Sequence, residues 1–517
     1  MGGAVWHQLE AEIVEVCRGK IRRHERRRSR LAAEVGRRAK RSSDSVDPLS
    51  GALPELWVAN PNLNPYDVLR RSSSLAYGIQ RSISSRAYSP HAPTLFSVQK
   101  SRGSHRVIST FEIADEAVSR IVFRSLTRKN RSLFGAHTYA YREDVGIYDA
   151  VRYVSSEWAG RSRLFVAEYD LKAYFDSINR AYLYELLSAR SVHATPLERS
   201  LCRAFLDAAD ATRDPHGVRP NGQEVGSGIP QGTTISLFLA NLAMLPLDRR
   251  LEDIGVKFTR YADDILFWSE DYGTACRGVD ALYAWSVQSG VALNSEKSRG
   301  LRLMSRDPLP EAELSSISSV DYLGHCIGLG GVKPKGSRIE ALRNEIERMI
   351  YVALLKEPLL GSQRLDRIRG GLDRDYISLI WQLRRKLYGH LSERQVLRLR
   401  RGYIPATGLT GAVAQFPVVT DRADFRELDQ WLRRRVWLAL RRRSLLLRPL
   451  LGRRRAPNLW DLPPSKLMRA SVRSVSTRQL VDLTMPSASL MAEVVERSIQ
   501  LHGPGVVRAS TRLYLAP

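Results

Sequence analysis

Short apolar stretches predict β-strands in the middle of the chain. One stretch runs from Val256 to Thr259, a second from Ile265 to Trp268, and the turn Tyr261-Ala262-Asp263-Asp264 separates them. Two strand-like segments joined by so short a turn predict a β-hairpin. Another apolar stretch, 165–169, ends at Asp170. We expect mixed structure over residues 55–330, with hairpins at these positions and helices between them.

Longer amphipathic patterns predict helices at both ends of the chain. Near the N-terminus, apolar residues recur at spacings of three and four, which predicts a helix over residues 1 to about 45 with one packed face (Ile13, Val14, Cys17 and Ile21). Residues 42–54 look like a linker. Three long amphipathic stretches follow residue 338, namely 339–355, 376–387 and 425–447, and predict an all-helical region. The pattern predicts an α+β protein with a basic helix and linker at 1–54, mixed structure at 55–330 and helices after that.

The charge of the chain indicates a polyanionic partner. Lys and Arg number 80 and Asp and Glu 54, a net charge of +26, which favours nucleic acid. The N-terminal helix carries a dense basic run (Arg22, Arg23, Arg26, Arg27, Arg28, Arg30, Arg37, Arg38, Lys40 and Arg41). Trp431 and Trp437 lie among arginines near the C-terminus. Arginines there could contact phosphates while Trp431 stacks on a base of primer or template; the alternative is that both tryptophans belong to a core.

Length and cysteine usage bound the remaining possibilities. A chain of 517 residues with 43% hydrophobic residues is expected to form two or three globular domains. No stretch reaches the about 18 consecutive apolar residues of a membrane span, so we expect no membrane partner. The four cysteines are scattered without a Cys-x-x-Cys pair (Cys17, Cys202, Cys276 and Cys326). We therefore expect neither disulfides nor a zinc site, and a cytoplasmic location.

The paired carboxylates of the predicted hairpin carry the chemistry. Adjacent like charges such as Asp263 and Asp264 are costly unless a cation neutralises them. Asp170 ends a strand in a similar setting. Together the three predict a two-metal site for phosphoryl transfer. Taken alone, an Asp-Asp pair is more often a solvated turn, because Asp is a preferred turn residue.

These two stretches resemble motifs A and C of reverse transcriptases, within a resemblance that covers about residues 95–330. Asp170-Leu171-Lys172-Ala173-Tyr174-Phe175 is similar to motif A. The resemblance implies that Asp170, Asp263 and Asp264 are catalytic, and that they hold Mg²⁺, or Mn²⁺, together with the backbone carbonyl of Leu171. Phe175 occupies the steric-gate position, which implies a deoxynucleotide substrate, although ordinary core packing is the alternative. Tyr261 of motif C is expected beside the nucleotide.

Two further stretches are similar to the fingers and palm entry of the family. Residues 99–109 look like the fingers hairpin, where Lys100, Arg102 and Arg106 would bind the triphosphate of the incoming nucleotide. A solvated basic hairpin is the alternative. Tyr139-Ala140-Tyr141-Arg142 resembles the palm-entry signature. Arg142 is either a substrate or template contact or a member of a structural ion pair.

Three more motifs follow in the order that the family requires. Residues 228–236 resemble motif B, with Gln231 near the nucleotide and Gly232 near the template; the family often has a proline soon after this motif, and here Leu237 and Phe238 follow. Residues 293–298 look like motif D, where Lys297 would protonate the leaving pyrophosphate or would be an ordinary surface lysine. Residues 322–325 resemble the primer grip, where Gly324 allows close approach of the primer.

The resemblance implies a right-hand polymerase: fingers and palm at 55–330, a thumb at 331–400 and a basic helical extension at 401–517. Neither a Cys/His endonuclease cluster nor the usual retron signatures are evident, and the chain resembles the unknown-group, defence-associated and abortive-infection reverse transcriptases. This implies an RNA-directed DNA polymerase with deoxynucleotides, an RNA template and a DNA product as partners. Antiphage defence is the expected role, with a noncoding RNA template or with untemplated or protein-primed synthesis. A group II intron or retron-type mobile-element enzyme and a non-catalytic RNA-binding scaffold are the alternatives. A partner protein or a second copy of the chain also stays open.

Overall fold

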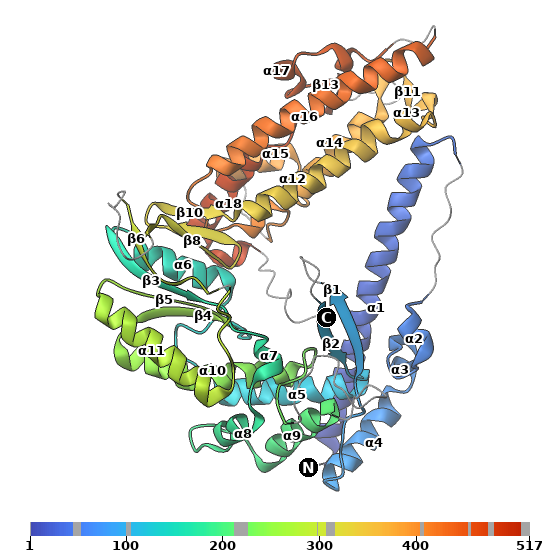
Figure 1. The fold of residues 1–517 in the computed structure, drawn as a ribbon. Helices are drawn as coiled ribbons and strands as arrows, with labels where there is room; N and C mark the ends of the chain where they lie inside the picture. The colour runs from blue at the N-terminus through green and yellow to red at the C-terminus, as the bar shows by residue number, and fades with distance from the viewer. Residues whose placement is uncertain are drawn as a thin grey trace.

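The structure is a computed structural model. It describes residues 2–44, 53–99, 105–210, 226–296, 298–306, 316–403, 408–452, 456–473 and 480–507. Figure 1 shows a palm sheet with helices around it, a bundle of long helices above, and a single long N-terminal helix along one side. The architecture is α+β with a right-hand arrangement of fingers, palm and helical region, as the sequence predicts.

A five-stranded sheet forms the palm, in the order β4-β5-β3-β6-β7. Its neighbours are antiparallel except β6 and β7, which are parallel. The bounds are β3 (Arg163–Tyr169), β4 (Lys257–Tyr261), β5 (Asp264–Ser269), β6 (Gly300–Ser305) and β7 (Ser316–Ile317). Alternate residues of β5 enter two different cores: Leu266 and Trp268 pack with α6 (Ile147–Trp158), whereas Ile265 and Phe267 pack with α10 (Thr234–Ile254) and α11 (Tyr272–Ser289). The central strand β5 is apolar from Ile265 to Trp268 because both faces of the sheet are covered there.

The fingers lie beside α10 and consist of short helices around a hairpin. Their elements are α2 (Glu55–Ala59), α3 (Pro65–Arg70), α4 (Ser72–Ser84), β1 (Thr94–Gln99), β2 (His105–Thr110) and α5 (Ile113–Lys129). The antiparallel pair β1–β2 is the hairpin predicted over 99–109. Three further helices complete the palm: α7 (Tyr174–Ser177), α8 (Arg180–Ser188) and α9 (Pro196–Asp210).

The C-terminal region is mostly helical. The predicted helices are confirmed as α12 (Gly336–Ile350) continuing into a π-helical turn (Tyr351–Leu355), α14 (Arg374–Tyr388) and α16 (Ala423–Leu447). The other helices are α13 (Lys356–Leu360), α15 (Glu393–Arg400), α17 (Pro464–Leu467) and α18 (Ala488–His502), with 3-10 turns at 365–367, 413–415, 448–450, 458–461 and 504–506.

The prediction that this region is all-helical is wrong, because it contains two short antiparallel β-ribbons. The strands have two residues each in the first ribbon and three each in the second. These are β11 (Ile368–Arg369) with β12 (Leu372–Asp373), and β13 (Ser471–Arg473) with β14 (Leu480–Asp482). Strands so short give no periodic signal in the sequence. A separate three-stranded sheet, β8 (Ser319–Tyr322), β9 (His325–Gly328) and β10 (Gly331–Pro334), joins the palm to the helices. Its last strand lies beyond residue 330, where the sequence placed the start of the thumb.

The N-terminal helix α1 (Gly2–Arg41) connects the two ends of the molecule. Its first half packs on α3, α4 and α5 through the predicted apolar face, where Ile13 and Cys17 are fully buried. Its C-terminal end reaches the far helices, where Ser42 pairs with Gln363 in an antiparallel bridge. The four cysteines are free thiols, as predicted. Within the described part of the chain, no helix combines the length and the apolar character needed to cross a bilayer.

Candidate active site

The two adjacent aspartates lie at the tip of a two-residue hairpin. Tyr261 of β4 faces Asp264 of β5 across the turn, so that Ala262 and Asp263 alone make the connection. Ala262 has a φ of 59°, in the left-handed region that residues other than glycine rarely adopt. The hairpin is the structure predicted for this segment. Tyr261, predicted to lie beside the nucleotide, is buried in the palm core.

The sheet brings Asp170 to the same place. Tyr169 is paired with Ile265 between antiparallel strands, so the next residue on β3 lies opposite Asp264. Opposed residues in such a pair have Cα atoms about 4.5–5.5 Å apart. The three aspartates predicted from the sequence are therefore gathered at one edge of the palm.

The electrostatics of Asp264 follow from this proximity and from burial. Its pKa is raised to about 7, first because water is removed from around the carboxyl group, and then because of the negative charges of Asp263, Asp170 and Glu168. The residue still reaches solvent. Lys335 acts in the opposite direction on this pKa; no sequence motif had marked this lysine. Carboxylates held this close repel one another, and a bound cation would stabilise the group by neutralising their charge.

Asp170 is fixed by the segment after α11. The Asn294 side chain donates to Asp170 Oδ2 at 3.1 Å, and the Asp170 backbone N–H donates to Ser298 Oγ at 3.2 Å. Leu171 and Leu293 lie opposite each other in an isolated antiparallel β-bridge. The two hydrogen bonds of this bridge are made by the residues that flank them, not by Leu171 or Leu293. The Leu171 carbonyl is thus not used by this bridge, which fits the predicted role as a metal ligand.

A buried arginine that no sequence motif marked holds the β4–β5 turn. Arg260 is 0% exposed and donates to both carboxyl oxygens of Asp248, at 2.7 and 2.5 Å. It also donates to the carbonyl of Ala262 at 3.0 Å and to Asn241 Oδ1 at 3.1 Å. Burial acts to lower the pKa of Arg260, but Asp248 more than offsets this and the pKa is raised. One feature of the sequence could have identified Arg260: it is a charged residue among residues predicted to be buried. Charged residues are rarely buried without a partner of opposite charge.

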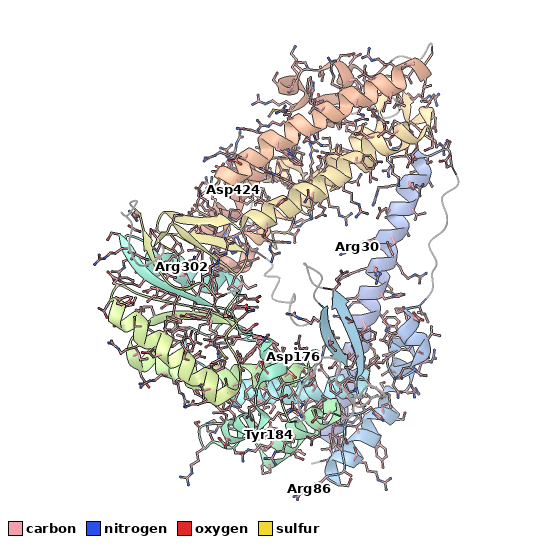
Figure 2. All side chains as sticks on the ribbon, viewed as in Figure 1. Arg30, Arg86, Asp176, Tyr184, Arg302 and Asp424 are labelled. Carbon is pink, nitrogen blue, oxygen red and sulfur yellow. The ribbon has the colours of Figure 1, made fainter. Side chains whose placement is uncertain are left out.

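The motif B loop connects the fingers to motif A. The Gln231 side chain donates to Asp176 Oδ1 at 3.1 Å, and the Ser109 N–H of β2 donates to the Gln231 carbonyl at 2.7 Å. Gly232 has a φ of 131°, and a Cβ there would lie 2.3 Å from the Ser109 carbonyl oxygen. Phe175, the predicted steric gate, is half-buried, and its carbonyl accepts from the Ile229 N–H at 2.7 Å. Figure 2 shows Asp176 on the side of the palm that faces the β1–β2 hairpin.

The predicted primer grip lies next to the aspartates. The Tyr322 hydroxyl is 3.5 Å from the backbone carbonyl of Asp264, and Leu323 and Gly324 form the turn that follows. Both turn residues have positive φ, 47° and 81°. Burial raises the pKa of Tyr322 strongly, so its hydroxyl stays protonated.

Other predicted contacts lie elsewhere. Arg142 donates to Asp144 and to the carbonyls of Gly135 and Thr138, so the structural ion pair is formed; this hydrogen bonding lowers the pKa of Asp144 to about 2. Trp431 is half-buried against the core of the C-terminal region. Arg106 is exposed on β2. Three predicted residues lie outside the described residues: Lys100, Arg102 and Lys297.

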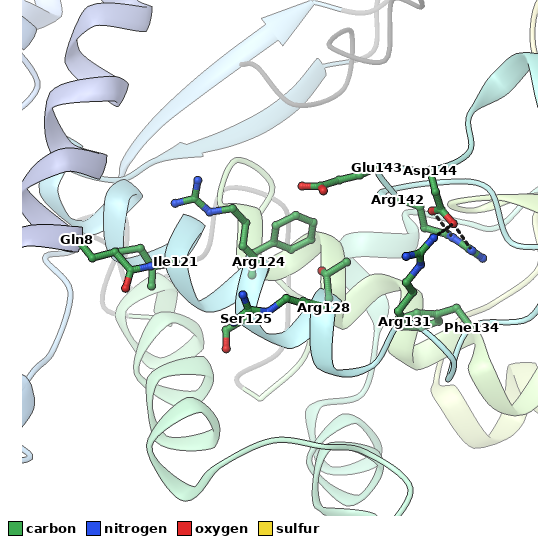
Figure 3. A pocket seen from close by; sticks show the side chains of 12 residues that line it. Gln8, Ile121, Arg124, Ser125, Arg128, Arg131, Phe134, Arg142, Glu143 and Asp144 are labelled. Atoms are coloured by element: carbon green, nitrogen blue, oxygen red, sulfur yellow. Dashed lines mark hydrogen bonds and ion pairs between the residues drawn. The ribbon is translucent and has the colours of Figure 1, made fainter. Parts of the chain in front are cut away.

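A separate cavity lies in the fingers (Figure 3). Its volume is about 620 Å³, and its lining combines α1, α5 and the 131–144 loop. Four arginines border it, namely Arg124, Arg128, Arg131 and Arg142. None of the three aspartates lines it, so it is not the site of the predicted chemistry.

Comparisons with known proteins identify a family for the segment that contains this site. Residues 98–327 match the family model of the reverse transcriptase (RNA-dependent DNA polymerase). This match covers less than half of the chain, and it makes the segment similar to the reverse transcriptases, the RNA-directed DNA polymerases. The retron Mx65 reverse transcriptase of Myxococcus xanthus is 34% identical over 145 residues, which is 26% of this chain and 33% of that protein. The chain thus spans about a third of the length of this curated relative.

Solved structures of low similarity include two telomerases. The telomerase of Candida albicans with the TWJ fragment of telomeric RNA has a TM-score of 0.35 and 12% identity, over 75% of this chain and 67% of that one. An apo telomerase of Candida tropicalis has a TM-score of 0.33 and 14% identity, over 47% of this chain and 55% of that one.

Proposed function

We propose that this chain extends a primer with deoxynucleotides on an RNA template, and that Asp170, Asp263 and Asp264 bind divalent magnesium for this reaction. The observation that carries the proposal is the convergence of three carboxylates from β3 and the β4–β5 turn; loss of water around the carboxyl group and then these like charges raise the pKa of Asp264 to about 7. Oxygen donors of this kind suit a hard cation. Bound Mg²⁺ would neutralise the triphosphate and favour ionisation of the primer hydroxyl.

The remaining residues would position the reactants. Arg106 would bind the triphosphate; this role is supported by its exposure on β2, in the hairpin that a hydrogen bond from Ser109 joins to the motif B loop. The Phe175 ring would exclude a ribose 2′-hydroxyl. The Leu323–Gly324 turn, next to the Asp264 carbonyl, would support the primer end. Positioning and charge neutralisation supply most of the rate in phosphoryl transfer.

The biological role that we propose is antiphage defence. The support is the resemblance of the motifs to unknown-group enzymes and the mostly helical region that follows the family match at residue 327. A noncoding RNA would be the template, or synthesis would be untemplated or primed by a protein. A retron-type enzyme is the second candidate, and the similarity to the retron Mx65 enzyme favours it.

The test is incorporation of labelled deoxynucleotides by purified protein with Mg²⁺, with the co-purified RNA retained or digested. We expect DNA only when RNA is retained, and sequencing the product would identify the template and separate a retron from a defence enzyme. Product after RNA removal would indicate untemplated synthesis.

Asp263→Ala supplies the catalytic control for this assay. Incorporation should be lost, because a metal ligand is gone, whereas Asp280→Ala, an exposed aspartate of α11, should have no effect. A folded Asp263→Ala protein with normal incorporation would overturn the metal assignment.

A further inference from the structure

The middle of α1, residues 22–34, packs little against the described part of the chain. From Arg22 to Glu34 every side chain is exposed except that of His24, whose ring lies 5.0 Å from that of Trp57 in a tilted arrangement. This segment of 13 residues spans about 20 Å at about 1.5 Å per residue. A helix that is polar on all sides is not stabilised by burial and must be held by its ends. Here both ends are anchored.

The C-terminal anchor is a built contact. The Ser43 N–H donates to the Ser362 carbonyl at 2.7 Å, and the Arg364 N–H donates to the Arg41 carbonyl at 2.8 Å. Arg41 is only 4% exposed, and Arg38 Nε lies 3.7 Å from Glu357 Oε1.

This anchor adjoins the most deeply buried ion pairs of the helical region. Arg443 donates to Asp373 at 2.8 Å and to Asp375 at 2.9 Å, and all three side chains are 0% exposed. Gln363 accepts from Arg443 and donates to Asp375, both at 3.1 Å. The helix end therefore docks on a rigid surface rather than on a loose loop.

Contacts between elements close the chain into a ring. The first half of α1 packs on α5, α5 packs on α10 of the palm, α6 of the palm packs on β9, and the helical region leads back through α12, α13 and Gln363 to the end of α1. Figure 1 shows this circuit, and Figure 2 shows Arg30 on the side of α1 that faces the palm and the C-terminal helices. The palm edge with Asp176 faces the same interior.

The charge of the exposed segment identifies its partner. Six arginines lie between residues 22 and 34, against two glutamates: Arg22, Arg23, Arg26, Arg27, Arg28 and Arg30, with Glu25 and Glu34. Nucleic acid phosphates are the polyanion that the palm chemistry places nearby. We propose that α1 is a strap that closes the protein around the template–product duplex and holds its phosphates as the duplex leaves the palm. This inference rests on the proposed polymerase function.

The structure provides a way to lock the strap. Ser42 and Gln363 face each other as a non-hydrogen-bonded pair, since their neighbours make the hydrogen bonds of the bridge. Such pairs have Cα atoms about 4.5 Å apart, within the range of about 4.4–6.8 Å for disulfides. A Ser42→Cys/Gln363→Cys protein can be loaded under reducing conditions on a circular RNA with an annealed DNA primer and then oxidised.

We expect the oxidised protein to stay on the circle through a wash at high salt, and to leave after cutting of the circle or reduction. The single variants Ser42→Cys and Gln363→Cys should wash off, and they also measure any loss from the Gln363 hydrogen bonds. Release of the oxidised double variant at the rate of the single variants would overturn the proposal, as would failure of the disulfide to form. Absence of incorporation by the unmodified protein would instead refute the proposed polymerase function.

The arginines can be tested separately through the salt dependence of duplex binding. Each lost phosphate contact lowers the slope of log K against log salt by about 0.9, so Arg26→Ala/Arg27→Ala/Arg30→Ala should lower it by up to about 2.7. The matched control removes three exposed arginines of the palm: Arg190, Arg249 and Arg250. Equal slopes for the two triple variants would remove α1 from the binding surface.

Discussion

Replacing Arg260 by Met should destabilise the palm strongly. Asp248 is 1% exposed and receives two hydrogen bonds from Arg260, at 2.7 and 2.5 Å. Removing one partner of a buried pair leaves an uncompensated charge and costs about 3–5 kcal/mol. Because the whole free energy of unfolding of a domain is about 5–15 kcal/mol, this single change would remove a large part of it.

The double variant Arg260→Met/Asp248→Leu separates stability from catalysis. Removing both charges should restore much of the stability, because no buried charge is left alone. Incorporation should nevertheless stay about 3- to 10-fold below normal, the equivalent of about 0.5–1.5 kcal/mol for one hydrogen bond. The reason is that the Ala262 carbonyl has lost the donor that holds the catalytic turn.

The assay is amide hydrogen exchange of β4 and β5, which reports the free energy of opening of the palm, together with incorporation rates. Arg250→Met, an exposed arginine on the same helix as Asp248, is the control and should change neither. If Arg260→Met lowered the free energy of unfolding by less than about 1 kcal/mol, Asp248 would not be left as a buried, unpaired charge, and the reasoning would be refuted. Full incorporation by the double variant would show that the turn needs no support from Arg260.

Three further predictions concern the site itself. The stability of the metal-free protein should fall as pH rises from about 4 to about 7. The reason is that folded Asp264, with a pKa of about 7, retains a proton that the unfolded chain releases. Asp264→Asn should flatten this pH dependence of the melting temperature and abolish incorporation, and an unchanged pH profile in this variant would contradict the assignment. Gly232→Ala should lower the melting temperature and raise the KM for nucleotides, because its Cβ would lie 2.3 Å from the Ser109 carbonyl oxygen. The control is Gly226→Ala, which has a φ of 88° and nothing within 4 Å of its Cβ, so it measures the effect of backbone strain without a clash. Phe175→Val should increase incorporation of ribonucleotides relative to deoxynucleotides, and an unchanged ratio would mean that the ring is only core packing.

The sequence predicted those features that depend on local patterns. The β4–β5 hairpin follows from two apolar runs around Ala262 and Asp263, and the long helices follow from apolar residues at spacings of three and four. The strand end at Asp170 and the hairpin tip at Asp263 and Asp264 indicated a metal site, because such ends meet at one edge of a sheet, but the assignment depended on the resemblance to motifs A and C. Their catalytic roles remain proposals to be tested by incorporation.

Features that depend on contacts between distant segments were not predictable from one sequence. The pairing of Arg260 with Asp248 requires knowledge of how α10 lies against β4. The motif analysis assigned Gly232 to the template, whereas the structure shows that the approach of Ser109 from the fingers already requires a glycine there. Likewise, the basic run on α1 predicted nucleic acid binding, but nothing local indicated that its end meets Gln363.

The contact that closes the ring, between the end of α1 and the helical region, has a consequence for biosynthesis. Ser43 and Ser362 are 319 residues apart in the chain, and a ribosome adds about 5–20 residues per second. The N-terminal helix therefore emerges roughly 15–60 s before its docking partner exists. Late in this interval, once β7 (Ser316–Ile317) has completed the palm sheet, an RNA strand with no free end can lie across the palm, and docking of the helix end then encloses it. A protein built in this way could acquire its RNA while it is being translated.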